Sequence, residues 1–199
     1  MLTVVLLLAG LAPAPLTLDV SMYLGAGLSE DIVVSALRET KRIFEPGGIE
    51  LRFDLSPDNH TSRPFVTVLV QPRPARFKVY GCSRNRHDHR LAHTQLRARR
   101  ITLWSEQVAR AVEGDWDRTG PPDVDAGVFA RALGRVLAHE LGHVLLRLDG
   151  HRDRGLMRSA FSHRSLTARG RRAFRLAEDD LQAIRDTLLH AGAASGGSR

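Results

Sequence analysis

Residues 139–157 read HELGHVLLRLDGHRDRGLM, and the rest of the sequence is best understood from this stretch. His139 and His143 are four positions apart, and Glu140 directly follows the first of them. Side chains at positions i and i+4 of an α-helix lie on one face, so both imidazoles can reach a single metal ion. Imidazole is a common zinc ligand, and a carboxylate beside the ion can take a proton from a zinc-bound water. The pentapeptide therefore predicts a zinc site with Glu140 as its general base.

A catalytic zinc site needs a third protein ligand, and two candidates follow the helix. His151 comes directly after Gly150, and we expect this glycine to provide the backbone freedom that turns the chain back toward the metal. Asp149 is the alternative ligand; otherwise it would support the site from outside the coordination shell. We favour His151 because imidazole is the commoner zinc ligand in such sites. One catalytic Zn²⁺ ion is the expected cofactor.

The sequence before this motif predicts an alternation of strands and helices. Ser29 is expected to cap a helix that ends before Pro46. Asp125 is expected to cap the helix that carries the zinc motif, from Val128 to about Leu146. Short apolar or alternating segments predict strands at residues 16–23, 49–53, 65–70, 77–80 and 100–104. This order of elements indicates an α/β fold with helices packed across a twisted sheet.

Residues 139–157 look like the metal-binding segment of the metzincin zinc peptidases, and most of all like that of their matrixin branch. Gly155-Leu156-Met157 stands where that family has its methionine turn, which would place Met157 beneath the metal. Residues 176–184, LAEDDLQAI, are similar to the start of the matrixin C-terminal helix. The sequence departs from the metzincin pattern HExxHxxGxxH, because Leu146 stands at its glycine and Asp149 at its last histidine.

The resemblance implies a zincin-like α/β (α+β) fold. This fold has a twisted mixed sheet, an active-site helix with the HExxH motif, and a small C-terminal lobe that ends in a helix. It also implies a zinc-dependent endopeptidase that hydrolyses peptide or protein substrates with Glu140 as general base. Asp179 and Asp180 would make buried polar contacts near the methionine turn and would take no part in catalysis.

Substrate recognition can be predicted in outline for such an enzyme. We expect an extended peptide to pair main chain with main chain along an edge strand that contains Ile101, Thr102 and Leu103. Residues 158–175 would form the wall of the pocket for the residue after the cut. A preference for acidic or large polar side chains is expected there, because the segment contains six arginines: Arg158, Arg164, Arg169, Arg171, Arg172 and Arg175.

Three further histidines and the single cysteine precede the last predicted strand. His87, His89 and His93 stand where matrixins hold a structural metal, partly through a Leu-Ala-His sequence. A second structural metal is not expected, because the acid- and glycine-rich loops that should accompany it are missing. Cys82 has no partner for an internal disulfide and is expected to be a small core residue.

The 199 residues suit a single domain with a terminal segment at each end. Residues 1–14 are apolar and end in Ala12-Pro13-Ala14, so we expect a signal peptide and a secreted or periplasmic protein. No basic residue precedes this run, so a mis-set start codon or a buried first strand is the alternative, and the protein would then be cytoplasmic. The run is shorter than the roughly 20 residues of a membrane span, so no stable span is expected. The predicted organisation is a catalytic domain at 15–190, with an upper lobe at about 15–146 and a lower lobe at about 147–190, and a flexible tail at 191–199.

The arginine-rich composition raises an alternative function. The net charge is +7 and only Lys41 and Lys78 among 29 basic residues are lysines, which indicates a composition bias more than a selected surface. The alternative is a non-catalytic domain that binds a protein or polyanionic partner through its arginines. Glu140 argues against it, because a structural zinc site has no use for an acid beside the metal. No nucleic-acid partner is expected, since the arginine clusters lack interleaved aromatic residues apart from Phe174. If the domain were non-catalytic, its structural zinc site would be closed by four protein ligands, for example His139, His143, Asp149 and His151.

Overall fold

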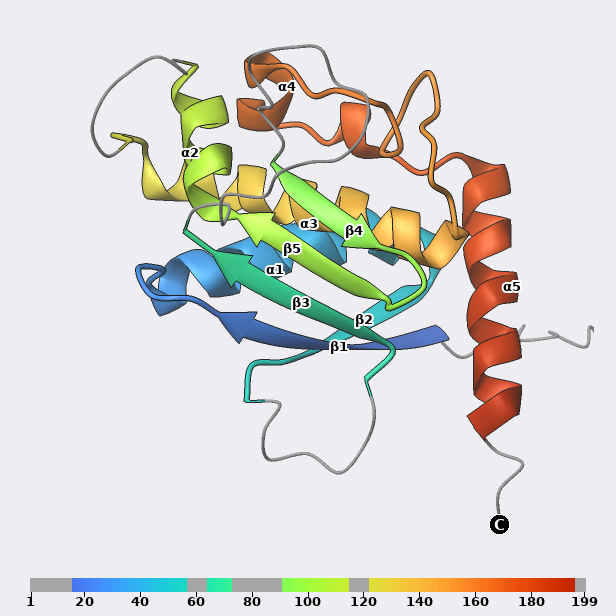
Figure 1. Cartoon of the computed structure of the whole chain (residues 1–199). Coiled ribbons are helices and arrows are strands. Elements are labelled where there is room, and N and C mark those ends of the chain that lie inside the picture. Colours follow the sequence, from blue (N-terminus) through green and yellow to red (C-terminus); the bar gives the residue numbers. More distant parts are fainter. Residues whose placement is uncertain (1–15, 57–63, 73–90, 115–121, 196–199) are drawn as a thin grey trace, which may run out of the picture.

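The computed structural model describes residues 16–56, 64–72, 91–114 and 122–195 (Figure 1). The predictions for residues 1–14, for a strand at 77–80, and for Cys82, His87 and His89 lie outside these residues. No described helix has the length and apolar character needed to cross a membrane.

Five strands form one mixed sheet in the order β2-β1-β3-β5-β4. The first four strands in this order run parallel, and β4 runs antiparallel to β5. Parallel strands covered by helices on a face are typical of α/β folds, so the predicted class agrees with the sheet. The strands are β1 (Leu16–Leu24), β2 (Ile49–Asp54), β3 (Val66–Gln71), β4 (Ala92–Gln95) and β5 (Arg100–Trp104).

The predicted edge strand is wrong. Residues Ile101–Leu103 lie in β5, which has β3 on one side and β4 on the other. The short strand β4 pairs with β5 through the register Thr94↔Ile101 and therefore occupies the edge. Ile101 and Leu103 are fully buried, as expected for a strand in the interior of a sheet. An incoming peptide can pair only with a free edge, which β5 does not offer.

The helices are α1 (Glu30–Phe44), α2 (Ser105–Glu113), α3 (Ala126–Leu146), α4 (His163–Thr167) and α5 (Glu178–Ser195), with short 3₁₀ turns η1 (Glu45–Gly47) and η3 (Arg172–Phe174). Figure 1 shows α1 and α3 side by side behind the sheet. They approach closely at Gly134, where an added Cβ would meet the carbonyl of Ala36. Thr40 Oγ1 also donates to Gly134 O at 3.0 Å and joins the two helices.

A buried ion cluster ties the C-terminal part of the chain to these two helices. Arg135 of α3 is fully buried, and its Nε donates to Glu39 Oε1 of α1 at 3.0 Å. Arg171 donates to the other oxygen of Glu39 at 2.9 Å, and the Arg135 guanidinium lies 4.6 Å from the ring centre of Phe174. A buried arginine needs such a full set of acceptors, because an unpaired charge in the core is costly. Nη1 of Arg135 donates to the carbonyls of Ser165 and Leu166, and Nη2 donates to the carbonyl of Gly170.

The C-terminal helix is longer than predicted. α5 continues to Ser195, so residues 191–195 are helical and do not belong to a tail that begins at 191. Its first turn contains Glu178, Asp179 and Asp180, and acidic residues at a helix N-terminus are favourable for the helix dipole. The division of the chain into two lobes stays a prediction.

Candidate metal centre

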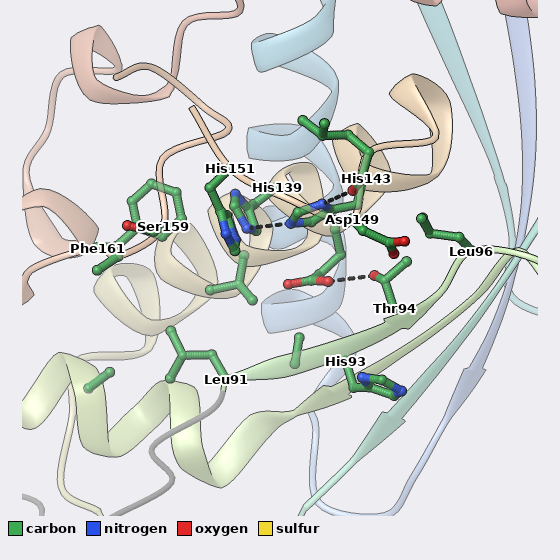
Figure 2. Close-up of a pocket in the computed structure, with 16 residues that line it drawn as sticks. Leu91, His93, Thr94, Leu96, His139, His143, Asp149, His151, Ser159 and Phe161 are labelled. Carbon is green, nitrogen blue, oxygen red and sulfur yellow. Dashed lines mark hydrogen bonds between the residues drawn. The ribbon is translucent and has the colours of Figure 1, made fainter. Parts of the chain in front are cut away.

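The long helix α3 carries the metal-binding motif and begins where the sequence predicted. Asp125 caps it by accepting a hydrogen bond from the Val128 N–H at 2.8 Å. The helix is buried along most of its length, which holds His139, Glu140 and His143 in fixed positions at the bottom of a cleft. Figure 2 shows His139 and His143 beside His151, with Thr94 of β4 nearby.

The two helix histidines are held in one tautomer by main-chain carbonyls. His139 Nδ1 lies 2.7 Å from Leu156 O, and His143 Nδ1 lies 2.6 Å from Leu148 O. A carbonyl oxygen only accepts, so each Nδ1 carries the proton and each Nε2 has a free lone pair. The two Nε2 atoms are 3.0 Å apart. Two lone pairs facing each other at this distance need a cation near them, so the donor set fits a metal ion.

His151 completes the set of imidazoles. Its ring stacks on His139 with centroids 5.4 Å apart and meets His143 edge-on at 4.9 Å. One ring nitrogen from each of the three histidines lies within 4.8 Å of the others. Asp149 lines the same cavity but does not belong to this group (Figure 2). The geometry therefore favours His151 over Asp149 as third ligand.

The turn that brings His151 back to His139 and His143 differs from the prediction. Gly150 does not adopt a positive φ; the left-handed residue is Arg147, with φ 51° and ψ 41° at the C-terminus of α3. Leu148 N–H then donates to His143 O at 3.1 Å, as in a Schellman-type helix end. This turn also places Leu148 O against Nδ1 of His143. The helix terminus and the orientation of one ligand thus depend on the same turn.

The segment after His151 packs against α3 at Gly142. Met157 is fully buried, and a Cβ added to Gly142 would collide with its Sδ. Gly155 has φ 74° and approaches the carbonyl of Arg175, which also accepts from Leu156 N–H at 2.9 Å. A side chain at Gly155 would collide with that carbonyl, so glycine is required there.

The two predicted acids on α5 behave differently. Asp180 is buried and accepts from Nη2 of Arg152, next to His151, at 3.1 Å. Arg152 N–H in turn donates to Met157 O at 2.7 Å. Asp179 is exposed, so the expectation of a buried contact is wrong for this residue. Successive helix positions are about 100° apart, so only one of the two acids can face the loop.

Glu140 is buried beside the histidines and contacts the edge strand. Thr94 Oγ1 donates to Glu140 Oε2 at 2.5 Å. Burial raises the pKa of the Glu140 carboxyl, while the Thr94 hydrogen bond and the charge of His143 act in the opposite direction. No sequence pattern predicts this contact; the nearest signal is the Leu91-Ala92-His93 triplet just before Thr94, which suggests only a metal loop. Among the described residues, His93 belongs to no cluster of metal-binding side chains.

Burial also favours the neutral form of His139 and of His151. It lowers the pKa of His139 to about 4, against the opposing effect of the Leu156 hydrogen bond. It lowers the pKa of His151 as well, and the charge of His143 adds to that effect. Neutral imidazole is the form that binds a metal, so both groups are ready to do so at neutral pH.

The site opens into a cavity of about 730 Å³. The ring of Phe161 meets the His139 ring edge-on at 5.1 Å and forms part of the wall. Residues 158–175 do contribute to this wall, but through Ser159, Ala160 and Phe161. None of the six arginines of that segment lines the described cavity, so the basis for an acidic preference is wrong. The other apolar lining residues are Leu91, Ala92, Leu96, Ala111, Val136 and Leu148.

Comparisons with known proteins place the fold. No family model matches the sequence, and no curated protein sequence matches it. The structure is similar to the crystal structure of archaemetzincin from Methanopyrus kandleri, with a TM-score of 0.54 and 13% identity over 90% of this chain and 99% of that chain. The structure of myroilysin matches with a TM-score of 0.41 and 11% identity, over 86% of this chain and 92% of that chain. At this level of identity the likeness to archaemetzincin concerns the fold, and it confirms the predicted zincin-like class.

Proposed function

We propose that the protein is a zinc-dependent endopeptidase in which His139, His143 and His151 hold the metal and Glu140 is the general base. The observation that carries this proposal is the set of three imidazoles within 4.8 Å of one another, beside a buried carboxylate and open to a cavity. A bound zinc ion would supply a Lewis acid that polarises a peptide carbonyl and makes water more acidic. The assignment to the matrixin branch is a finer proposal that rests on the sequence motifs alone.

The chain's own groups have separate tasks in this proposal. Leu156 O and Leu148 O fix the Nδ1–H tautomers, which directs the Nε2 atoms of His139 and His143 toward the ion. Glu140 would take a proton from the attacking water and return it to the amine that leaves. Burial raises its pKa, which suits a carboxyl group that must both accept and release a proton.

A substrate peptide would lie along β4, the edge strand that borders the cavity. β5 cannot take this role, because it has a strand on each side. Because Phe161, Ala111 and Val136 line the cavity, an apolar side chain next to the cut is favoured over an acidic one. Export of the protein is a further proposal, and it rests only on the apolar residues 1–14.

Zinc content and cleavage of a broad peptide library test this function in one preparation. The wild type should hold one zinc, cleave peptides with apolar enrichment beside the cut, lose activity to 1,10-phenanthroline and regain it with added zinc. His151→Ala should lose zinc, whereas Asp149→Ala should keep it. Loss of zinc in Asp149→Ala alone would make Asp149 the third ligand.

The alternative is a structural zinc domain that binds a partner through its arginines, with Asp149 as a fourth ligand. Asp149 lines the same cavity as the histidines, which is the observation in its favour. A wild type that holds zinc through all four groups and cleaves nothing in the library would support it.

A further inference from the structure

The hydroxyl of Thr94 borders the cleft and has no role in the reaction proposed above. Thr94 lies on β4 between two exposed residues, His93 and Gln95, and its own side chain is half-buried and faces α3. Its Oγ1 donates to Oε2 of Glu140 at 2.5 Å, and Figure 2 shows the hydrogen bond crossing from the strand to the helix. The two residues are 46 positions apart in the sequence, so the folded sheet alone brings them together.

This hydrogen bond has a consequence for the orientation of the carboxylate. Glu140 is only 8% exposed, so a partner for its oxygens must come from the protein or from the cleft. Thr94 occupies Oε2, which leaves Oε1 as the oxygen that can face a reacting water. Three single bonds separate the carboxylate from the Glu140 backbone, so an unheld carboxylate would sample several rotamers.

We propose that Thr94 is a positioning residue that fixes the Glu140 carboxylate for proton transfer. The inference rests on the proposed peptidase function, and it adds a residue of the edge strand β4 to the groups that prepare the site for proton transfer. The strand that would pair with the substrate main chain then also fixes the orientation of the general base Glu140. Thr94 acts through Glu140 and does not itself exchange a proton with substrate.

Three variants separate the hydroxyl from the shape of the side chain. Thr94→Val keeps the branched shape and removes the donor, and Thr94→Ser keeps the donor. Thr67→Val is the matched control, because it makes the same change on β3 of the same sheet, away from the cavity. We expect Thr94→Val to lower kcat about ten- to a hundredfold, the range for losing a hydrogen bond to a charged group, with KM and zinc content unchanged. Thr94→Ser should restore most of kcat, and Thr67→Val should behave as wild type.

A second measurement does not depend on activity. Urea unfolding of zinc-loaded wild type, Thr94→Val, Glu140→Ala and the double variant gives the coupling between the two side chains. If Thr94 holds the Glu140 carboxylate, Thr94→Val should shift the midpoint of urea unfolding in the wild-type background and leave it unchanged in the Glu140→Ala background.

The outcomes distinguish this inference from the proposed function. If the wild type cleaves peptides but Thr94→Val matches it in kcat, or if Thr94→Ser fails to restore kcat, the inference is wrong and the peptidase function stands. If the wild type cleaves nothing, the catalytic role of Thr94 is overturned together with the peptidase function. In that case a coupling free energy of zero between Thr94 and Glu140 in urea unfolding would show that the contact itself is absent. A non-zero coupling free energy would leave it as a structural contact only.

Discussion

Met157 Sδ lies against Gly142, one position before the metal-site residue His143. Both residues are buried, and an added Cβ at Gly142 would collide with the sulfur and come within 3.7 Å of Leu156 Cδ2. The glycine at the fourth position of the HELGH motif therefore allows the turn that contains Met157 to pack directly against α3 at the candidate metal site.

Gly142→Ala should for this reason destabilise the protein, although alanine is the better helix former. We expect a loss of about 1–3 kcal/mol in the free energy of unfolding, as for other overpacked cores. Urea unfolding gives the value. In a Met157→Ala background the space is free, so the same change should cost nothing or stabilise; an equal loss in both backgrounds would show that Met157 is not the obstacle.

Arg147 offers a change that should increase stability. Its φ of 51° is a left-handed conformation that costs a residue with a Cβ about 1 kcal/mol relative to glycine. Arg147→Gly should therefore raise the free energy of unfolding by about 1 kcal/mol while zinc content stays the same. Arg147→Ala is the control, because it removes the same charge and keeps the strain. A gain with alanine equal to that with glycine would mean that the side chain, and not the backbone, is responsible.

The ion pair between Arg152 and Asp180 should support the binding of the third ligand. Asp180 holds Arg152, the residue after His151, at 3.1 Å. Asp180→Asn weakens this link, and we expect zinc affinity to fall about tenfold, as for other groups that support a ligand from outside the coordination shell. Asp179→Asn makes the same change at the exposed neighbour and should have no effect. Competition with a zinc-sensitive dye measures both; equal affinities would remove this role for Asp180.

The low pKa of His139 predicts how the stability of the metal-free protein depends on pH. Its pKa is about 4 in the folded protein and 6.5 for the ordinary group, so between these values the unfolded chain binds more protons than the folded one. The stability present above pH 6.5 should thus fall by about 3 kcal/mol as pH decreases to 4. Glu140 has the opposite effect. Because its pKa is raised in the folded protein, the folded state binds more protons than the unfolded chain above pH 4.5, and the free energy of unfolding falls as pH rises from that value.

Urea unfolding in EDTA across this pH range tests the prediction. Comparison of the wild type with His139→Gln isolates the histidine, because the variant lacks the titrating group and retains Glu140. The difference between the two proteins should change with pH between 4 and 6.5. A difference that does not change with pH would show that His139 is not held neutral by burial.

The grouping of the residues of the candidate metal site was predictable because its signal is local. His139, Glu140 and His143 lie within one helical turn or so, and the cap at Asp125 and the buried positions of α3 are also local features. His151 and Met157 follow within a short segment whose order resembles a known family. Helix α2 had a local signal that was overlooked, since Val108, Ala111 and Val112 have helical spacing and Gly114 ends the helix with φ 79°.

The errors concern contacts that depend on the whole fold. β4 has only four residues, and nothing in Ala92–Gln95 indicates that the chain returns antiparallel to β5 and takes the edge. The Thr94–Glu140 hydrogen bond depends on that placement. The buried Arg135 was likewise hidden, because its acceptors come from Glu39 and from carbonyls about 30 residues later. The left-handed position at the end of a helix favours glycine but does not require it. In α3 this position is occupied by Arg147 and not by Gly150.

The proposed catalytic role of Glu140 is tested most sharply by zinc content and peptide cleavage measured together on the wild type and on Glu140→Ala, with the exposed Glu50→Ala as control. We expect one zinc per chain in all three proteins, with cleavage in the wild type and in Glu50→Ala only. A Glu140→Ala protein that cleaves as fast as the wild type would contradict this role, and so would a zinc-loaded wild type that cleaves no peptide.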